Sequence, residues 1–337
     1  MLNINDDSAL GPATRLRDLA RLTGYSASTI SRALRDDSRI NEETKSRIWQ
    51  MAHDYGFPVG KYLGLQQNCH GQIHIVIPRL PTRTGSLKEP FLLELLAHIG
   101  DEARACNCDL VLSAISPSSE EELEAFFKLT GNSTAIVLGQ GLLHDALNKA
   151  AERWRNFVVW GARMEDQLYC SVGSDNFAGG FKAATHLVRT GHKTLLFLGD
   201  TLGPEMNQRY MGFQQAALEL GAQASLAECR LDVDAASAVI EMMIASNQPI
   251  DGIFSVNDVT AIGAINALTR HNRSIPSDVS VIGYDDIEYC RFIRPRLSTI
   301  SQNSIRAARM LVAKTMEGNL TAAGSEYLPT ELIVRET

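Results

Sequence analysis

The feature that most constrains this 337-residue chain is a pair of short helices predicted near its start, within residues 14–39. Leu16 and Leu19 recur at the spacing of one buried helix face, and Gly24 ends that pattern. Ser26 is a suitable N-cap for a second helix that follows at once. Two short helices joined by a tight turn with glycine form a helix-turn-helix unit, although an ordinary helical hairpin within a larger core has the same spacing.

A helix-turn-helix unit places the start of its second helix in the major groove of DNA. Ala27, Ser28 and Arg32 fall on the outer face of that helix, where serine can bond several base edges and arginine can bond guanine in a bidentate manner. Hydroxyl groups suited to phosphate oxygens belong to Ser26, Thr29 and Ser31. The other candidate DNA contacts are the arginines Arg15, Arg17 and Arg39.

The order of residues in this segment closely resembles the headpiece of the LacI family of bacterial transcription regulators. The matching positions are Asp18, Ala20, Gly24, Ser26, Thr29, Ser31, Arg32 and Leu34. The resemblance implies a sequence-specific DNA-binding regulator. It also implies a homodimer, whose two headpieces read the half-sites of an operator in double-stranded DNA.

The charge distribution agrees with one small DNA-binding module on an acidic body. The net charge of the chain is −7. Residues 14–62 hold nine Lys or Arg and six Asp or Glu, a net charge of +3, so the remaining residues sum to −10. A mildly basic headpiece of this kind predicts that affinity for DNA depends on two headpieces acting together.

The linker after the headpiece departs from the family pattern. Asn41 is a suitable cap for a third helix, which completes a DNA-binding domain over residues 14–56. Its inner stripe is expected at Ile48, Met51, Ala52 and Tyr55. Residues 57–70 follow as a hinge, for which the resemblance implies a leucine wedge in the minor groove, here Leu65. Glycines in this hinge weaken helix propensity, so a flexible tether stays open as the alternative.

From residue 71 onward, short apolar runs alternate with helical periods. This order predicts an α/β core of parallel sheets flanked by helices, over residues 71–337. The number of units indicates two lobes, with lobe 1 over about 71–170 plus about 300–337 and lobe 2 over about 171–299. The predicted elements include strands over 157–160, 194–198, 228–231 and 252–255 and a helix over 210–220.

Several stretches of this region resemble the regulatory core of the same family, which is similar to periplasmic sugar-binding proteins. They cover residues 175–180, 209–213, 251–258 and 279–287, and residues 294–300 resemble the crossover that returns the chain from one lobe to the other. The resemblance therefore implies a periplasmic-binding-protein-like core with an effector site between its two lobes.

Polar residues that follow predicted strands are the candidates for effector binding, because ligands of open α/β sheets bind outside the carboxyl ends of the strands. Asp285 follows such a strand, and Arg209 offers a planar five-donor fork for oxygen atoms. The further candidates are Asn257, Arg163, Asp175 and Trp160. Asp175 and Asp258 are equally suited to cap helices, and a tryptophan such as Trp160 is more often a core residue than a stacking surface.

Composition and motifs exclude several other classes. No apolar run reaches the 18 residues of a membrane span, and residues 1–13 lack the basic group of a signal peptide, so we expect a disordered lead-in and a cytoplasmic protein. The six cysteines form no Cys-x-x-Cys pair, which argues against a zinc site or disulfide framework. No hydrolase or protease motif is present, and we expect no enzyme activity, cofactor or metal.

The sequence therefore predicts a repressor whose operator affinity is controlled by a mono- or disaccharide bound between the lobes. Acidic, amide and guanidinium side chains suit the hydroxyl groups of sugars. A nucleobase or a phosphorylated sugar acting as a co-repressor remains an alternative. A solute-binding protein for transport is a distant one, because such a protein needs a signal peptide and has no use for residues 14–56.

Overall fold

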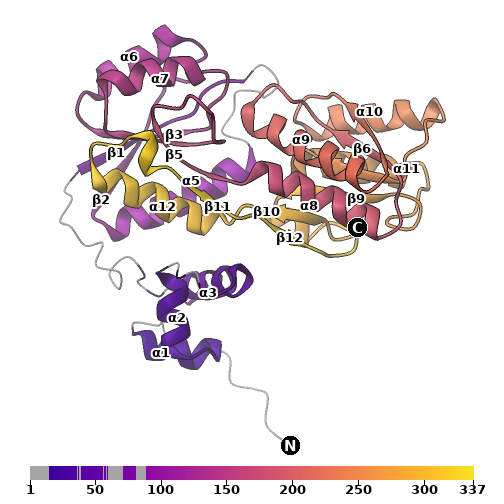
Figure 1. Cartoon of the computed structure of the whole chain (residues 1–337), viewed down its shortest axis with the longest axis horizontal. Helices are drawn as coiled ribbons and strands as arrows, with labels where there is room; N and C mark the ends of the chain where they lie inside the picture. The colour runs from indigo at the N-terminus through magenta and orange to yellow at the C-terminus, as the bar shows by residue number, and fades with distance from the viewer. Residues whose placement is uncertain are drawn as a thin grey trace, which may run out of the picture.

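The computed structural model describes residues 15–35, 37, 39–55, 57, 59, 71–80 and 89–337, apart from the side chain of His53. A small helical domain lies beneath a larger core of two lobes (Figure 1). The expected lead-in over 1–13 and most of the expected hinge, including Leu65, fall outside the described residues. None of the described helices combines the length and the apolar character that a membrane crossing requires.

The helical domain contains α1 (Leu16–Thr23), α2 (Ala27–Leu34) and α3 (Glu42–Asp54). α1 ends where Gly24 takes a left-handed conformation, with φ 74°, and donates its amide to Ala20 O. Ser26 Oγ caps α2 by accepting from Thr29 N at 3.0 Å. The predicted helix-turn-helix and its caps are therefore confirmed.

The three helices share a small apolar core. Leu19, Ile30 and Ile48 are fully buried there. Trp49 is also buried, and its Nε1 donates to Ala33 O at 3.1 Å. The expected inner position of Tyr55 is wrong, because its side chain is exposed. α3 instead buries Trp49, because this helix packs on both its own domain and the larger core, as described below.

The first lobe is built on a parallel sheet in the order β11-β5-β4-β3-β1-β2. Its strands are β1 (Gly71–Val76), β2 (Cys108–Leu112), β3 (Thr134–Leu138), β4 (Phe157–Trp160), β5 (Cys170–Ser174) and β11 (Glu326–Leu328). Alternate residues point to opposite faces, as in β3, where Ile136 packs with one cluster and Val137 with another. The helices of this lobe are α5 (Pro90–Ala105), α6 (Glu120–Thr130), α7 (His144–Arg153) and α12 (Ser304–Glu317).

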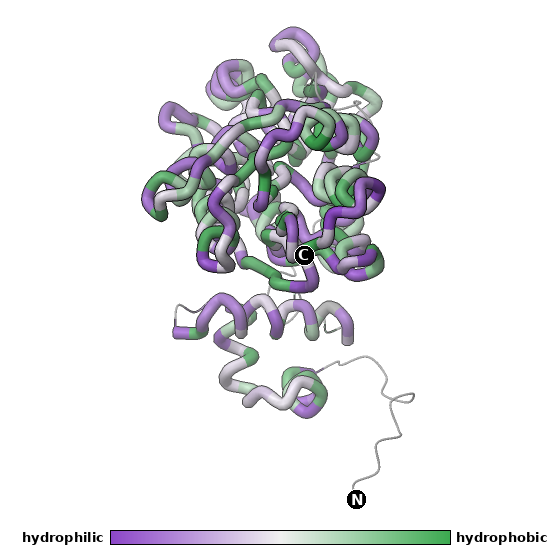
Figure 2. The backbone as a smooth tube through the Cα atoms, turned by 90° about the vertical axis from the view of Figure 1, so that its right-hand side faces the viewer, coloured by the Kyte–Doolittle hydropathy of each residue, from purple (hydrophilic) through white to green (hydrophobic). Residues whose placement is uncertain are grey.

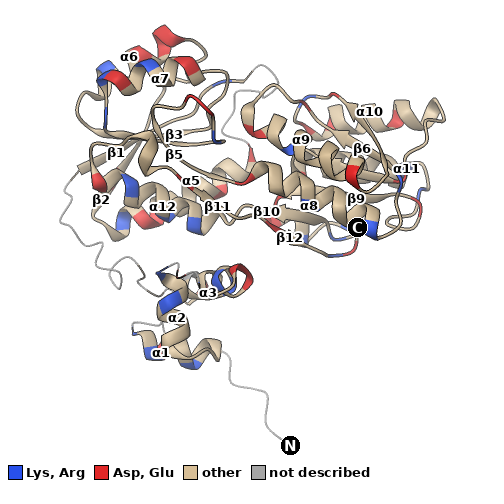
Figure 3. Ribbon diagram, in the orientation of Figure 1, with Lys and Arg blue, Asp and Glu red and all other residues tan. Residues whose placement is uncertain are grey.

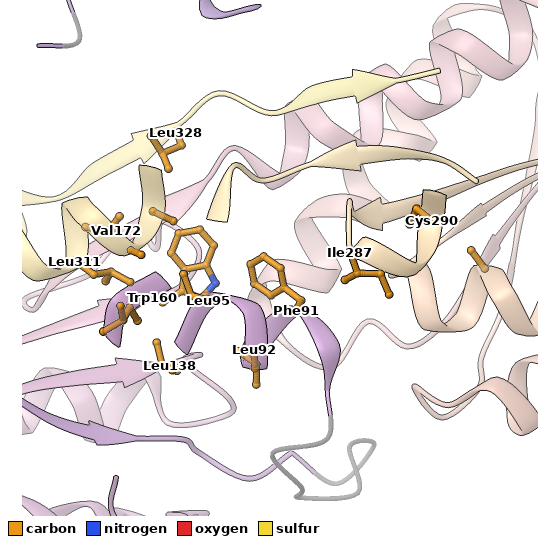
Figure 4. Packing of buried hydrophobic residues seen from close by; sticks show 14 of the residues in the cluster. Phe91, Leu92, Leu95, Leu138, Trp160, Val172, Ile287, Cys290, Leu311 and Leu328 are labelled. Atoms are coloured by element: carbon orange, nitrogen blue, oxygen red, sulfur yellow. The ribbon is translucent and has the colours of Figure 1, made fainter. Parts of the chain in front are cut away.

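Helices α5 and α12 cover one face of the first sheet. Leu95 of α5 and Leu311 of α12 pack there against Trp160 and Val172 of the strands (Figure 4). Helices α6 and α7 cover the opposite face, where Phe127 stacks on Trp154 with ring centroids 5.3 Å apart. Both faces are therefore apolar, as expected for a parallel sheet.

The second lobe repeats this plan with a sheet in the order β12-β10-β9-β8-β6-β7. Its strands are β6 (Thr194–Leu198), β7 (Gln223–Ala227), β8 (Gly252–Ser255), β9 (Ser280–Asp285), β10 (Ser298–Ser301) and β12 (Glu331–Ile333), of which only β12 is antiparallel to its neighbour. Its helices are α8 (Asn176–Arg189), α9 (Pro204–Glu219), α10 (Val233–Ala245) and α11 (Asp258–Arg270). Two short 3₁₀ helices, η1 (Glu288–Arg291) and η2 (Ala322–Gly324), complete the core.

Three expectations about the core need correction. α9 begins at Pro204, where proline suits a first turn, rather than at residue 210. The strand expected over 228–231 lies earlier, as β7. The exposed residues at the start of β7 do not give the apolar pattern of a buried strand, but the edge of a sheet tolerates them. Residues 300–337 do not belong to lobe 1 alone, because β10 and β12 both pair within the second sheet.

The chain passes between the lobes at three places. It leaves the first sheet after β5, returns after β10 through Gln302 and Asn303, and passes again between β11 and β12. The crossover therefore lies just beyond residues 294–300, which end within β10 itself. These connections bring the carboxyl ends of strands from both sheets to the junction between the lobes.

Candidate functional site

A cleft lies at this junction and holds most of the expected effector residues. It encloses about 510 Å³ of space, its open mouth included. Lobe 1 contributes Phe91, Trp160 and Ser174, and lobe 2 contributes Asn176, Glu205, Arg209, Asn257 and Asp285. Gln302, in the crossover, completes this part of the lining.

Arg209 is the most tightly held of these side chains. It is buried, and its Nε donates to Asn176 Oδ1 at 2.9 Å while its Nη1 donates to Val256 O at 2.7 Å. The guanidinium carbon lies 3.6 Å from the ring centroid of Tyr284. Nη1 also lies 3.8 Å from Asp285 Oδ1. The guanidinium is thus fixed in place before any ligand arrives.

Two glycines, in the stretches 175–180 and 209–213, explain how Arg209 reaches this position. A Cβ atom at Gly180 of α8 would lie 1.9 Å from Arg209 O, and one at Gly212 of α9 would lie 2.0 Å from Phe177 O. α8 and α9 therefore cross with their backbones in direct contact, which only glycine permits at these two positions. The stretches 175–180 and 209–213 fold as one unit that holds Arg209 against the cleft.

Asp285 ends β9 and is also buried. Its φ of 115° is rare for a residue with a side chain, and such backbone strain is concentrated at binding sites. Gln302 Nε2 donates to Asp285 Oδ1 at 2.6 Å, and Gln302 Oε1 accepts from Ser174 Oγ at 2.5 Å. Burial raises the pKa of Asp285 well above its ordinary value, although the Arg209 charge lowers it.

The two residues before α11 have different surroundings. Asn257 Oδ1 caps that helix by accepting from Thr260 N at 2.9 Å, and the residue also lines the cleft. Asp258 lies outside the cleft lining and accepts hydrogen bonds from Thr299 Oγ1 and Ile287 N. Its side chain is fully buried, and burial raises its pKa. Asp258 thus connects structural elements behind the site.

The other expected effector residues take three different positions. Trp160 lines the cleft but is buried against Phe91, with ring centroids 6.0 Å apart (Figure 4). Asp175 is exposed and caps α8 by accepting from Ala178 N at 2.9 Å. Arg163 is exposed and lines a separate groove. The structure therefore brings Arg209, Asp285, Asn257 and Trp160 together, and it leaves Asp175 and Arg163 apart from them.

The lining also contains residues that the sequence alone did not single out: Glu89, Ser174, Asn176, Glu205 and Gln302. Ser174 ends β5 and Gln302 follows β10, so each fits the rule that ligands bind beyond the carboxyl ends of strands. Neither β5 nor β10 has the long apolar run that predicts a strand from the sequence. Glu205 lies in the first turn of α9, a turn that the expected start of this helix left out.

The outer surface of the helix-turn-helix is open. Ala27, Ser28 and Arg32 are exposed on α2, and Ser31 is half-buried. Ser26 and Thr29 bond one another through their hydroxyl groups at 2.8 Å. Lys and Arg side chains predominate on α1 and α2, whereas α3 carries both signs of charge (Figure 3).

The expected arginine contacts around this surface differ in their pairing. Arg17 is exposed, and Arg15 precedes α1 in a capping box with Asp18. Arg39 is exposed but pairs with Asp37, with Nη2 and Oδ2 2.5 Å apart. This pairing, chiefly through hydrogen bonds from Arg39, holds the pKa of Asp37 below its ordinary value. Arg39 would have to leave Asp37 to reach a phosphate.

The cleft carries no arrangement typical of a metal centre. Across the part of the chain that the structure describes, no three His, Cys, Asp or Glu side chains form a group suited to a metal ion. The cysteines at 106, 108, 170, 229 and 290 are free thiols. The site therefore offers hydrogen bonds, one buried cation and aromatic surface, a set suited to recognising a small polar molecule.

The fold and the site define a class of protein, a two-lobed small-molecule-binding core joined to a helix-turn-helix domain. Residues 15–58 match the model of bacterial regulatory proteins of the lacI family. Residues 184–337 match the periplasmic binding protein-like domain. The chain therefore carries a LacI family DNA-binding domain followed by a periplasmic-binding-protein-like core, and its matched relatives are transcription regulators rather than enzymes.

Individual relatives support this assignment along nearly the whole chain. The HTH-type transcriptional repressor CytR of Escherichia coli K12 is 27% identical over 343 residues, with 96% of each chain covered. The solved structure of the transcriptional regulator CelR with cellobiose has a TM-score of 0.66 at 21% identity, covering 96% of this chain and 99% of that one. A LacI family regulator from Enterococcus faecium with bound ribose also has a TM-score of 0.66, at 23% identity, covering 79% and 97%. At these identities the structural matches establish the fold.

Proposed function

We propose that this chain is a transcriptional repressor whose operator affinity is controlled by a neutral sugar bound between the two lobes. The observation that carries the proposal is the buried Arg209–Asp285 pair, which lies at the carboxyl ends of the lobe 2 strands in a cleft that Trp160 also lines. A guanidinium and a carboxyl group bind sugar hydroxyls as donors and acceptors, and an aromatic ring packs against a sugar face.

The charges of the lining favour a neutral sugar over a phosphorylated one. Among the described residues that line the cleft, Arg209 is the one cation, and the acidic residues are Glu89, Glu205 and Asp285. Even when Asp285 is protonated, two carboxylates face one guanidinium. Among these described side chains, a phosphate dianion would meet one attractive partner and two repulsive ones, which supports a neutral sugar.

Control of DNA binding requires that the sugar prefers one arrangement of the lobes. A sugar that touches residues of both lobes favours the arrangement in which those residues are close together. It can change operator affinity only by the ratio of its own affinities for the two arrangements. We expect induction, in which the sugar lowers operator affinity, as the outcome.

We also propose that the functional unit is a homodimer. Glu288 N donates to Glu94 Oε1 at 2.9 Å, which brings η1 against α5. Large exposed apolar side chains lie on or beside these elements: Leu93, Tyr289 and Phe292. An apolar face of this kind fits a self-complementary interface with a second copy, and two headpieces would then read two half-sites. Analytical ultracentrifugation should give a dimer, and Phe292→Asp should weaken it.

Thermal unfolding of the purified full chain tests the effector proposal. The panel contains ribose, cellobiose, lactose, glucose 6-phosphate and free nucleobases. A ligand at a hundredfold excess over its Kd stabilises the folded protein by about 2.7 kcal/mol. We expect a neutral sugar to raise the melting temperature, and the variant Asp285→Asn to lose the shift. A shift from the phosphorylated sugar or a nucleobase, with none from a neutral sugar, would overturn the assignment.

A further inference from the structure

The DNA-binding domain packs directly on the core through α3 and the start of α12. Arg306 Nη1 lies 2.7 Å from Glu42 Oε2, and the Arg306 side chain is buried. Asn303 Nδ2 donates to Ser46 Oγ at 3.1 Å. Both contacts join residues more than 250 positions apart in the sequence. Figures 1 and 2 show from two directions that α3 lies between the core and the other two helices of its domain.

The centre of this contact is a stacked pair, Trp49 and Arg309. The guanidinium carbon of Arg309 lies 4.4 Å from the ring centroid of Trp49, and both residues are at most 5% exposed. Neither terminal nitrogen of Arg309 has a hydrogen-bond partner among the described residues. Burial lowers the pKa of Arg309. A buried guanidinium whose terminal nitrogens lack hydrogen bonds is costly, and the face of an aromatic ring offsets part of that cost.

The contacts follow one face of each helix. Along α12 and its cap they fall on Asn303, Arg306 and Arg309, which are three residues apart. Along α3 they fall on Glu42, Ser46 and Trp49, at spacings of four and three. Such spacings place side chains on one side of a helix. Ile305 adds an apolar contact, because it belongs to the same buried cluster as Leu19 and Ile48.

Docking in this way leaves the DNA-reading surface free. Ala27, Ser28 and Arg32 of α2 stay exposed. α1 and α2 lie on the side of α3 that faces away from the core (Figures 1 and 2). The docked domain can therefore present its second helix to DNA while it remains attached to α12.

The docking surface adjoins the effector cleft through a single peptide unit. Gln302 bonds Asp285 and Ser174 within the cleft. The next residue, Asn303, bonds Ser46 of the DNA-binding domain and caps α12 by accepting from Arg306 N at 3.1 Å. Consecutive side chains thus contact the cleft on one side and the DNA-binding domain on the other.

We propose that the face of α12 formed by Asn303, Ile305, Arg306 and Arg309 is a docking surface for the DNA-binding domain of the same chain, and that the step from Gln302 to Asn303 couples the effector cleft to it. The docking stands on the contacts alone. The coupling rests in addition on the proposed effector function. Movement of Gln302 on ligand binding would shift Asn303 and the start of α12, and with them the orientation of α3.

Disulfide trapping in the full chain tests the docking without any ligand. The variant Ser46→Cys/Asn303→Cys places two thiols where the side chains now touch, and the matched control Ser28→Cys/Asn303→Cys places one on the exposed face of α2. We expect the first pair to form a cross-link within one chain on mild oxidation, and the control pair to form none. A cross-link between two chains, or equal yields from both pairs, would overturn docking within the chain.

A charge exchange tests the docking in proteins that keep the cap of α12. Glu42→Arg and Arg306→Glu each place like charges together, whereas the double variant restores an ion pair. We expect faster hydrogen exchange in α3 and early α12 for each single variant, and recovery in the double variant. Lys149→Glu, at an exposed ion pair with Glu120 elsewhere, serves as the control. Unchanged exchange in both single variants contradicts the docking.

The coupling is tested by Gln302→Ala in the Ser46→Cys/Asn303→Cys background. Gln302 contacts cleft residues, so a change in cross-linking rate must pass through the crossover. We expect the rate to change by about fivefold or more, the lower end of ordinary allosteric coupling. An unchanged rate overturns the coupling and leaves the docking intact. The cross-linking experiments use no sugar. If no compound of the thermal unfolding panel binds, the docking and the coupling can therefore still be tested separately from the proposed effector.

Discussion

The guanidinium of Arg209 lies over the ring of Tyr284, with 3.6 Å between its central carbon and the ring centroid. Tyr284 directly precedes Asp285 in β9. The contact with the Tyr284 ring therefore fixes the position of the Arg209 guanidinium relative to the Asp285 carboxyl group. Gly179 makes room for this arrangement, because a Cβ atom there would lie 2.7 Å from the Tyr284 ring. The cation of the cleft is therefore fixed by packing from α8 and β9, independently of a ligand.

Arg209→Lys should abolish most sugar binding although the charge is kept. Lysine cannot stack a planar group on Tyr284 while bonding Asn176 and Val256 O, so its ammonium will not hold the same position. Loss of a hydrogen bond to a charged group costs about 1.5–3 kcal/mol, or about 10-fold to 150-fold in affinity. Titration calorimetry with the sugar found in the thermal panel measures this loss. Arg153→Lys, on an exposed ion pair, should bind normally.

Gly180→Ala should destabilise the core and Gly100→Ala should stabilise it. The added methyl group at position 180 meets the backbone of α9, and overpacking of this kind costs about 1–3 kcal/mol. At position 100, in α5, the nearest atom is 3.7 Å from the new Cβ, so the better helix propensity of alanine should contribute about 0.5–1 kcal/mol. Urea unfolding compares the two variants. The same sign of change in both would contradict the crossing described for α8 and α9.

Asp258 should make the core less stable as the pH rises from about 4 to about 7. Burial raises its pKa from 3.8 to about 7 in the folded protein. A carboxyl group with a raised folded pKa favours folding below its unfolded pKa, and this contribution is lost as the pH rises through the folded value. The free energy of unfolding of wild type minus that of Asp258→Asn should therefore fall across this range. A constant difference would show that Asp258 does not titrate there.

Arg32→Ala and Arg17→Ala should weaken DNA binding in different ways. Arg32 is exposed on the outer face of α2, where loss of a bidentate contact to guanine should cost about 1–3 kcal/mol and relax specificity at one position. Arg17 is expected to contact phosphate, so its loss should lower affinity for all sequences alike and reduce the salt dependence. Fluorescence anisotropy with a selected operator and its point variants, at several salt concentrations, separates these outcomes. Sugar binding should be unchanged in both variants.

The sequence predicted elements best where burial is continuous. The strands over Phe157–Trp160, Thr194–Leu198 and Gly252–Ser255 lie where they were expected, because their apolar runs are bounded by polar residues or turns. β5 and β11 were not predicted. β5 consists mainly of small or polar residues, and β11 has only three residues and pairs with β5 from about 150 positions away, a contact that no local pattern reveals.

In the cleft, too, the sequence identified the residues that lie in a local pattern and missed those that only distant contacts bring to the site. Arg209 and Asp285 stood out because each lies within a stretch that resembles the LacI family. Glu89 and Gln302 have no such local signal, and they join the lining only because three crossings bring the lobes together. The contact between Trp49 and Arg309 was beyond prediction for the same reason, since each residue reads as an ordinary member of its own helix.

The position of the edge strands also bears on how the protein is made. β11 and β12 each complete an edge of one sheet, and both follow every other described strand in the chain. During translation, both lobes therefore remain one strand short until residues 326–333 have left the ribosome. The helix-turn-helix domain is a contiguous segment near the start and can fold long before that. A nascent chain thus completes its DNA-binding domain before it completes either of the two lobes that form the effector cleft.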